Sequence, residues 1–368
     1  MKNLSRCSFS FVSFLIFIFT AIISPVLAGS INESHQYNQP VKASNKHGAS
    51  SHYTPGNPIE HLQDQIDALQ AQVDSLTNVP QEVTVDCAAG ATVTDALASA
   101  ANSDVPLTIT ISGICEESIQ IDRDDVIIRG NSTADGFSLP TSALQVVINI
   151  TSGSRVILES LSVEGGRVGI SVLSGNVKVS GVEVRNASSA GISIGFSGFV
   201  ELDNSLITTN IQGINVNAGG TLRTSNTVIE DNTLYGIIAS NAASIIIADN
   251  TDTQTIIRNN QYGLTVSLNA SVIVSGALIE NNALHGIHAI TGGSVEFFIF
   301  PSTVQNNGGS GVYVGETSSV VFLNSSSTIT GNSIFGIECE PGSAYRTPRS
   351  GPGNVSGNNA GDIQSTCD

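Results

Sequence analysis

Short apolar segments of alternating polarity recur along the chain from about residue 82 onward. Each unit contains an Asn-rich turn, a glycine and an apolar-x-apolar strand, and two further short alternating strands complete it. The repeat glycines are Gly169, Gly191, Gly213, Gly236, Gly263, Gly286, Gly311 and Gly336, at intervals of 22, 22, 23, 27, 23, 25 and 25 residues. Period-two alternation predicts half-buried strands, and repeats of about 20–50 residues predict a solenoid or a propeller.

The length of the repeat selects among these architectures. Propeller blades need about 40–45 residues, and leucine-rich repeats need a Leu-x-x-Leu-x-Leu frame that this chain lacks. Three short strands in 22–27 residues fit one coil of a parallel β-helix. The sequence therefore predicts an all-β, right-handed parallel β-helix over residues 82–368.

Composition agrees with this fold. Only 12% of residues are charged, whereas Asn, Ser, Thr and the 36 glycines supply polarity and turns. Backbone groups in stacked coils pair along the axis, and we expect the turns to need positive φ, which favours Gly and Asn. The net charge of −17 excludes nucleic acid as a partner, because phosphates require a basic surface.

Residues 1–28 have the features of a secretory signal peptide. Lys2 and Arg6 precede an apolar run over 11–23, and Val26-Leu27-Ala28 offers small residues for cleavage. The alternative is a membrane anchor, but the run is short for a span of about 20 residues. We expect a secreted, periplasmic or cell-surface protein with no transmembrane segment after cleavage and a mature charge of −17 − 2 = −19.

Two segments separate the signal from the repeats. Residues 29–57 are predicted to be a disordered linker, whose three histidines are too widely spaced to indicate a metal site. Residues 58–78 predict a short coiled-coil helix with an apolar 3-4-3-4-3 seam. The seam consists of Ile59, Leu62, Ile66, Leu69, Val73 and Leu76. Residues 58–77 would join a homo-oligomer, either a dimer or a trimer; the alternative is a helix that packs on the main domain.

Aligning the units places polar side chains in columns. An asparagine column is expected to form an axial amide ladder and contains Asn210, Asn232, Asn260, Asn282, Asn307 and Asn332. Two positions earlier, a column of mixed charge contains Glu164, Arg185, Thr208, Glu230, Arg258, Glu280, Gln305 and Thr330, and an outward column begins Lys178, Glu201, Arg223. Alternating signs indicate solvated ladders that fix the register.

Four cysteines remain after the signal, and both local separations are 28 residues. Cys87 and Cys115 form the first pair and Cys339 and Cys367 the second. Three connectivities exist, and we predict the two local bridges, because coils about 4.8 Å apart suit disulfide geometry. A short helix over 92–101 should cap the first coil, and the tail over 341–368 should cover the last.

The coils resemble the right-handed parallel β-helix proteins of the pectate-lyase-like superfamily. The resemblance covers about residues 82–368 and is carried by the repeats, by the segments over 83–87 and 109–116, and by Gly90 and Ala96-Leu97. It implies the fold, whereas the activities of members range over lyases, hydrolases, epimerases, phage tail proteins and adhesins.

The catalytic patterns of such enzymes are incomplete here. Asn250-Thr251-Asp252 and His285-Gly286 match parts of a polygalacturonase-like pattern, but the paired aspartates, the first glycine of the histidine motif and the basic triplet are missing. No Asp-Pro-His-Asp run of the epimerase type exists. An acidic run could hold Ca²⁺, although solvated turns are favoured and no metal or other cofactor is predicted. This run contains Glu116, Glu117, Asp122, Asp124 and Asp125.

One cluster of aromatic residues suggests binding. Tyr235, Tyr262 and His285 directly precede repeat glycines, and His288 and Tyr313 occupy an outward column that continues to Glu338. Aromatic rings with directed polar groups suit sugar binding. We predict a glycan-binding site of Tyr235, Tyr262, His285, His288, Tyr313, Glu230, Arg258 and Glu280. In the alternative, the aromatics merely cover the turns; for catalysis, Glu280 or His285 would be the acid or base.

These features predict an exported glycan-binding or adhesive protein whose partner is a polysaccharide or a cell-surface glycan. One alternative is a polysaccharide lyase or hydrolase that uses the Tyr/His face. The other is a structural oligomer, for which an apolar outward column of Ile246, Ile273 and Val321 would supply an interface. The sequence does not identify the glycan.

Overall fold

The computed structural model describes residues 63, 65–69, 80–100, 105–250, 252–323, 326–346, 354–364 and 366–367. The predicted signal peptide and linker lie outside the described residues, as does most of the predicted coiled-coil segment. Within that segment, residues 63 and 65–69 are helical, and the side chains of Ile66 and Leu69 are 54% and 61% exposed.

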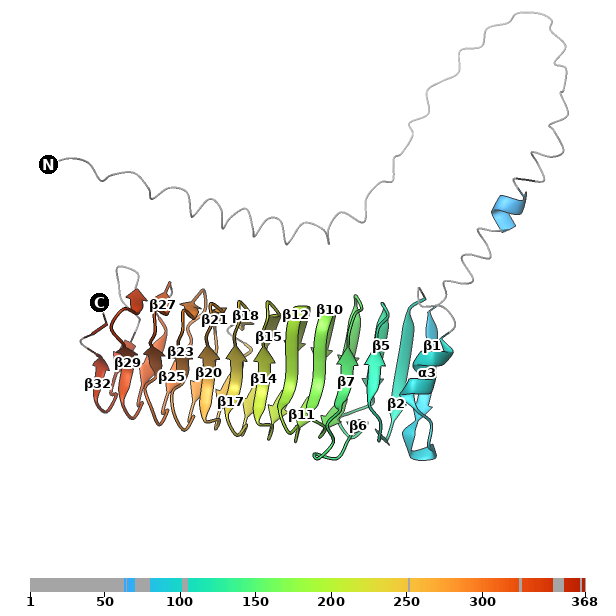
Figure 1. Ribbon diagram of the computed structural model, residues 1–368, viewed down its shortest axis with the longest axis horizontal. Coiled ribbons are helices and arrows are strands. Elements are labelled where there is room, and N and C mark those ends of the chain that lie inside the picture. The colour runs from blue at the N-terminus through green and yellow to red at the C-terminus, as the bar shows by residue number, and fades with distance from the viewer. Residues whose placement is uncertain are drawn as a thin grey trace, which may run out of the picture. The chain divides into compact units, whose positions relative to one another are not determined.

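The chain from β1 onward winds into a parallel β-helix with three faces (Figure 1). The first face contains β4 (Ile119–Ile121), β7 (Val146–Ile150), the start of β10 (Val168–Ser180) and of β12 (Ala190–Asp203), β14 (Gln212–Val216), β17 (Tyr235–Ala239), β20 (Tyr262–Val266), β23 (Ile287–Ala289), β26 (Val312–Val314), β29 (Phe335–Cys339) and β32 (Gly361–Ile363).

The second face contains β1 (Gln81–Asp86), β2 (Leu107–Ser112), β5 (Val126–Gly130), β8 (Val156–Glu159), the ends of β10 and β12, β15 (Thr221–Ser225), β18 (Ser244–Ala248), β21 (Ser271–Ser275), β24 (Ser294–Phe297), β27 (Ser319–Phe322) and β30 (Ala344–Arg346). Because β10 and β12 run through the corner between these two faces, the first and second faces form one 21-stranded sheet.

The third face is a separate 11-stranded sheet of short strands. It contains β3 (Ile114–Cys115), β6 (Gly136–Ser138), β9 (Ser162–Glu164), β11 (Glu183–Arg185), β13 (Leu206–Thr208), β16 (Val228–Glu230), β19 (Ile256–Arg258), β22 (Leu278–Glu280), β25 (Thr303–Gln305), β28 (Thr328–Thr330) and β31 (Asn354–Ser356). Each coil passes from this face through an asparagine turn to the first face and then to the second. The prediction of three strands per coil is confirmed.

Inward side chains stack in columns to form the core. One column on the first face consists of Ile192, Ile214, Ile237, Leu264, Ile287, Val312 and Ile337, all fully buried. On the second face, the rings of Phe297 and Phe322 stack in the core with centroids 4.3 Å apart. Since adjacent coils repeat the same residue type, burial of apolar surface fixes the register of every coil.

The asparagine column forms the predicted ladder, and Asn358 extends it by one coil. In each step, the Oδ1 atom of one asparagine accepts hydrogen bonds from both the backbone N–H and the Nδ2 group of the asparagine one coil earlier. For Asn260 and Asn232, the distances are 3.0 Å and 3.1 Å. All seven asparagines are buried, so the ladder satisfies polar groups that water does not reach.

The expectation that the turns need positive φ is confirmed, because positive φ occurs at the residue before each ladder asparagine, for example at Asn259 and Asn281. The repeat glycines themselves lie outside that region. The glycines are required by close approach. A β-carbon at Gly263 would lie 2.5 Å from the carbonyl oxygen of Gly286 and 2.8 Å from the ladder amide of Asn282.

The first coil carries the predicted cap. The one-turn helix η1 (Cys87–Ala89) is followed by α3 (Val93–Ser99), whose Val93 and Ala96 side chains are buried against the core. Thr92 accepts a hydrogen bond from the backbone N–H of Asp95 at the start of α3, at 3.1 Å. The core at this end is therefore closed by α3.

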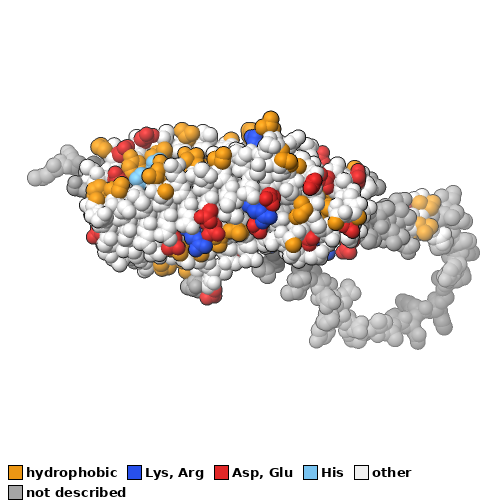
Figure 2. All heavy atoms as spheres, turned by 90° about the horizontal axis from the view of Figure 1, so that it is seen from below, with side chains coloured by type: hydrophobic (Ala, Val, Ile, Leu, Met, Phe, Trp, Pro, Cys, Tyr) orange, Lys and Arg blue, Asp and Glu red, His pale blue; other side chains and the backbone are white. Residues whose placement is uncertain are grey.

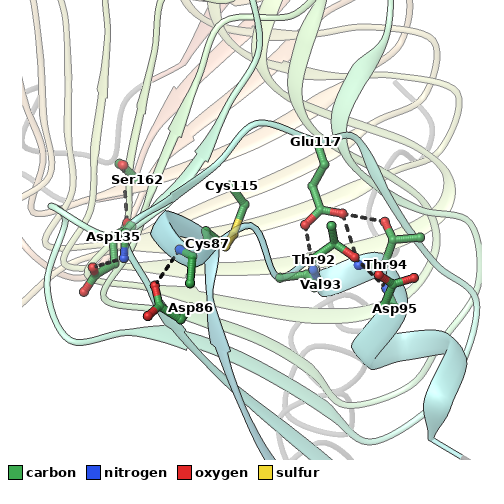
Figure 3. The surroundings of a disulfide bond; sticks show 12 residues. Asp86, Cys87, Thr92, Val93, Thr94, Asp95, Cys115, Glu117, Asp135 and Ser162 are labelled. Carbon is green, nitrogen blue, oxygen red and sulfur yellow. Dashed lines mark hydrogen bonds between the residues drawn. A yellow bond between two sulfur atoms is a disulfide. The ribbon is translucent and has the colours of Figure 1, made fainter.

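Both predicted disulfides are present, Cys87–Cys115 (Figure 3) and Cys339–Cys367, each with a Cα–Cα distance of 5.0 Å. The tail beyond residue 341 covers the last coil by continuing the solenoid, since β30, β31 and β32 pair in register with β27, β28 and β29. Each disulfide thus joins neighbouring coils near one end of the β-helix.

The two charged columns lie in the predicted register. Arg185 forms ion pairs with Glu164 and Glu183, and Arg258 pairs with Glu230 at 2.6 Å. In the outward column, Lys178 lies in register with Glu201, and the described residues show no ion pair there. The pairing of backbone strands between neighbouring coils, more than ion pairing, therefore holds these charged columns in register.

No helix among the described residues is long and apolar enough to cross a membrane. Two disulfides are compatible with an extracellular protein, because such bonds persist in oxidising compartments.

Candidate functional site

Five aromatic side chains lie together on the C-terminal part of the first face. Tyr235 and Tyr262 begin β17 and β20, His285 lies two residues before β23, and His288 and Tyr313 are the central residues of β23 and β26. Figure 2 shows the pale blue histidines among orange and red side chains near the C-terminal end of the β-helix.

The five rings form one continuous group, which we call the aromatic stack. The centroids of Tyr235 and Tyr262 are 5.6 Å apart, those of Tyr262 and His288 4.9 Å, and those of His288 and Tyr313 5.2 Å. His285 lies 5.3 Å from His288, with an angle of 15° between the ring planes. Such offset arrangements are favourable and hold each ring against its neighbours.

Register between the coils produces this stack. Tyr235 pairs with Tyr262, and Thr265 pairs with His288, which in turn pairs with Tyr313. Because these positions are anchored by fully buried neighbours in β17, β20, β23 and β26, the rings are held on a rigid surface. All five rings are half-buried, so part of each remains accessible.

Burial keeps both histidines of the stack uncharged at neutral pH. It lowers the pKa of His288 to about 4, with a contribution from neighbouring His285. It also lowers the pKa of His285, against the opposing charge of Glu338. The Nδ1 atom of His285 accepts the backbone N–H of Ser310 at 3.1 Å, whereas the buried Nδ1 of His288 has no hydrogen-bond partner.

Three carboxylates accompany the stack. Glu338 follows Tyr313 in the outward column and accepts the hydroxyl of Ser310. Glu340 accepts the hydroxyl of Tyr313, and burial together with this contact raises the pKa of that tyrosine. Glu316 accepts the hydroxyl of Thr291 at 2.6 Å, and its charge acts on both Tyr313 and His288.

Sequence reasoning missed Glu316 and Glu340, because both lie in or beside turns rather than in the aligned strand columns. It placed Glu338 in the outward column but not in the predicted site. The signal that could have identified all three was their position in or just beyond β26 and β29: Glu338 lies within β29, Glu340 directly follows it, and Glu316 lies two residues beyond β26.

The predicted charged members of the site lie elsewhere. Glu230, Arg258 and Glu280 end strands of the third face, on the other side of the asparagine turn from the aromatic stack. Arg258 pairs with Glu230, and Glu280 accepts a hydrogen bond from Gln305 at 2.7 Å. Among the described residues, no hydrogen bond joins Glu280 to His285, so the two catalytic candidates occupy separate environments.

The acidic run considered for Ca²⁺ is divided among structural contacts. Glu117 accepts hydrogen bonds from the backbone N–H groups of Val93 and Thr94, at 2.6 Å and 3.1 Å, and thereby caps α3 (Figure 3). Asp125 forms an ion pair with Arg155, which lowers the pKa of that aspartate. The described residues contain no group of three or more His, Cys, Asp or Glu side chains that could hold a metal ion.

Asp124 accepts the backbone N–H of Ser154 at 2.6 Å, and Glu116 and Asp122 are exposed. The partial polygalacturonase-like motif also has a local role, since Asn250 accepts the backbone N–H of Asp252 at 2.7 Å. Thr251 lies outside the described residues.

The apolar outward column is not continuous, which corrects the sequence interpretation. Ile246, Ile273 and Val321 face outward as expected and are half-buried, but Glu296 lies between Ile273 and Val321 in the same register. Burial raises the pKa of Glu296, yet the side chain still interrupts the stripe with a polar group.

Comparison with known proteins supports the architecture. A family model described as the right-handed beta helix region matches residues 146–299. Pectate lyase Pel9A aligns with a TM-score of 0.50 at 12% identity, covering 79% of each chain. This chain folds as a right-handed parallel β-helix.

Two further solved structures are less similar. The A-module of the mannuronan C-5 epimerase AlgE6 from Azotobacter vinelandii aligns with a TM-score of 0.45 at 15% identity, covering 74% of this chain and 93% of the module. An alginate lyase from Paenibacillus sp. aligns with a TM-score of 0.34 at 14% identity, covering 72% of this chain and 98% of the enzyme. No curated protein matches the sequence.

Proposed function

We propose that this β-helix is an exported protein that binds a polysaccharide or a cell-surface glycan along the aromatic stack. The observation that carries the proposal is the half-buried row of five rings on one rigid face. Sugar rings present apolar C–H faces and polar rims, so they suit an apolar strip with a few directed polar groups. The fold neighbour Pel9A is named a pectate lyase, which agrees with this class of ligand.

The stack is suited to binding because its rings are already ordered. Neighbouring coils fix each backbone position, so a ligand does not have to order the rings when it binds. The hydroxyl of Tyr313 is already oriented by Glu340, and Glu338 is oriented by Ser310. These fixed polar groups at the C-terminal end of the stack would orient a glycan chain.

A glycan array followed by calorimetry tests this proposal. Replacing Tyr262 and His285 together by alanine should abolish retention of the bound glycan, because it removes two of the five rings. Phe196→Ala is the matched control, since Phe196 is an aromatic side chain that is 67% exposed away from the stack. Tyr235→Ala gives a milder second variant, and circular dichroism verifies that each variant is folded.

Unchanged array binding by folded Tyr262→Ala, His285→Ala protein would refute the proposal. In the same experiment, release of reducing ends or unsaturated uronates from the bound polysaccharide would assign catalysis to this face instead of binding alone.

A second function, oligomer formation, is favoured by the exposure of Ile66 and Leu69 on helical residues. Apolar seam positions that are exposed in one chain would be buried between helices of a dimer or trimer. Sedimentation of the chain with and without residues 58–77 tests this function. A monomer in both cases would exclude it.

A further inference from the structure

The aromatic stack lies in a part of the chain with charge of one sign only. Residues 262–345 contain five glutamates and neither lysine nor arginine. Three of the five, Glu316, Glu338 and Glu340, are the carboxylates that accompany the stack. In Figure 2 the blue basic side chains lie away from the pale blue histidines. Near the stack, the electrostatic potential is therefore negative.

The partners of these carboxylates do not neutralise them. Each accepts a hydrogen bond from a neutral hydroxyl, those of Thr291, Ser310 and Tyr313 respectively. The four ion pairs among the described residues all involve other acids. The three charges near the stack are thus available to a ligand.

The aromatic rings of the stack also attract positive charge. Aromatic faces attract cations through their quadrupole, and the effect grows where water is partly excluded. At the floor of the same strip, the hydroxyl of Thr265 is buried without a hydrogen-bond partner, as is the Nδ1 atom of His288 in the adjacent coil. The strip therefore combines ring faces, carboxylates and unpaired polar atoms.

Building on the proposed glycan function, we infer that the aromatic stack selects glycans that carry free amino groups and discriminates against uronate polymers. A protonated hexosamine would place its ammonium group near Glu338 and Glu340 and its C–H face against the rings. A uronate would bring a carboxylate to the same negatively charged surface, where like charges repel. This ligand class differs from the pectate named for the fold neighbour Pel9A.

Three hexasaccharides of different charge test the inference. They are β-1,4-linked glucosamine, its fully N-acetylated counterpart and galacturonate, measured by calorimetry below the pKa of the sugar amine. We expect glucosamine to bind about tenfold more tightly than the acetylated oligomer, because a tenfold difference corresponds to about 1.4 kcal/mol. This energy is on the scale of one screened charge pair together with a cation–π contact. The advantage should shrink as salt is added.

Two carboxylate variants locate the effect. Glu338→Gln combined with Glu340→Gln should remove the advantage of glucosamine, so that glucosamine and the acetylated oligomer bind this variant equally tightly. Glu201→Gln combined with Glu82→Gln is the control, because it also removes two negative charges, from exposed strand positions on the second face. If glucosamine bound only through the overall negative charge of the protein, the control variant would weaken glucosamine binding as much as the Glu338/Glu340 variant does.

The outcomes separate this inference from the proposed function. Equal affinity for glucosamine and its acetylated counterpart, tighter binding of galacturonate, or equal effects of the Glu82/Glu201 and Glu338/Glu340 variants would each overturn the inference while glycan binding stands. Failure of all glycans to bind through Tyr262 and His285 would instead refute the proposed function itself.

Discussion

Removing one rung of the asparagine ladder tests how the coils are held together. The Oδ1 atom of Asn260 accepts the backbone N–H and the side-chain amide of Asn232, at 3.0 Å and 3.1 Å. Its own Nδ2 group donates to the carbonyl oxygens of Arg258 and Ile229, at 2.9 Å and 3.2 Å, and to Oδ1 of Asn282 at 3.2 Å. Asn260→Ala eliminates all five contacts at a site that is 1% exposed.

The size of the stability loss depends on which partners of Asn260 are left without a hydrogen bond. The buried backbone N–H of Asn232 has no second acceptor among the described residues, and an unsatisfied buried donor costs about 1–3 kcal/mol. The side-chain amide of Asn232 keeps two carbonyl acceptors, so the remaining lost bonds add about 1 kcal/mol each at most. We expect Asn260→Ala to lower the free energy of unfolding by about 3–5 kcal/mol.

Asn260→Asp should cost more than Asn260→Ala at neutral pH. Its second carboxylate oxygen would face three acceptors in a buried site, so repulsion and desolvation add to the lost bonds. Urea denaturation followed by circular dichroism measures both variants. Asn176→Ala is the control, because Asn176 is exposed and a surface change of this kind shifts stability by about 0.5 kcal/mol at most. The reasoning fails if Asn260→Ala costs no more than Asn176→Ala.

Three further predictions concern the glycine column, the disulfides and the histidines. Gly263→Ala should lower the melting temperature by several degrees, because its β-carbon would collide with the next coil. Gly195→Ala should leave the melting temperature unchanged, since the nearest atom of another residue, Oδ1 of Asn217, would lie 3.4 Å from its β-carbon. Equal shifts of both variants in calorimetry would contradict this account. Replacing Cys339 and Cys367 by alanine should lower the free energy of unfolding by about 3.6 kcal/mol, because the unfolded chain regains the entropy of a 28-residue loop. Limited proteolysis should then cut the C-terminal coils first, and an unchanged cleavage pattern would contradict this prediction. Stability should fall as the pH drops from 6.5 toward about 4, because unfolded His288 takes up a proton that folded His288 does not. His288→Phe should flatten this part of the melting-temperature profile, and an unaltered slope would count against it.

The fold could be predicted because stacked coils must repeat the same residue type at the same position. The 27-residue interval between Gly236 and Gly263 did not disturb the alignment, since the extra residues lie in the loop between β18 and β19. The role of the repeat glycines could not be predicted from the sequence. Positive φ and close approach both select glycine, and only the distance to Gly286 distinguishes them.

The site could be predicted only in part. Tyr235, Tyr262 and His285 align because each directly precedes a repeat glycine, so their stacking follows from register alone. Whether Glu230 or Glu340 lies near them depends on how the chain turns between faces. An alignment of the repeats identifies the columns but not the angle between columns around the coil, and for this reason the sequence did not show that the acids of the third face lie on the other side of the turn.

Charge along the axis separates two parts of the solenoid. From Asp125 to Arg258, four ion pairs link acids to arginines within or between coils. In the coils beyond, the column that contains Arg258 continues through a hydrogen bond from the uncharged amide of Gln305 to Glu280, and the asparagine ladder continues without change. Register in these coils therefore requires no ion pair. Glu316, Glu338 and Glu340 lie beside the aromatic stack outside the ion pairs of the described residues, and the preference for amino sugars that we propose rests on this arrangement.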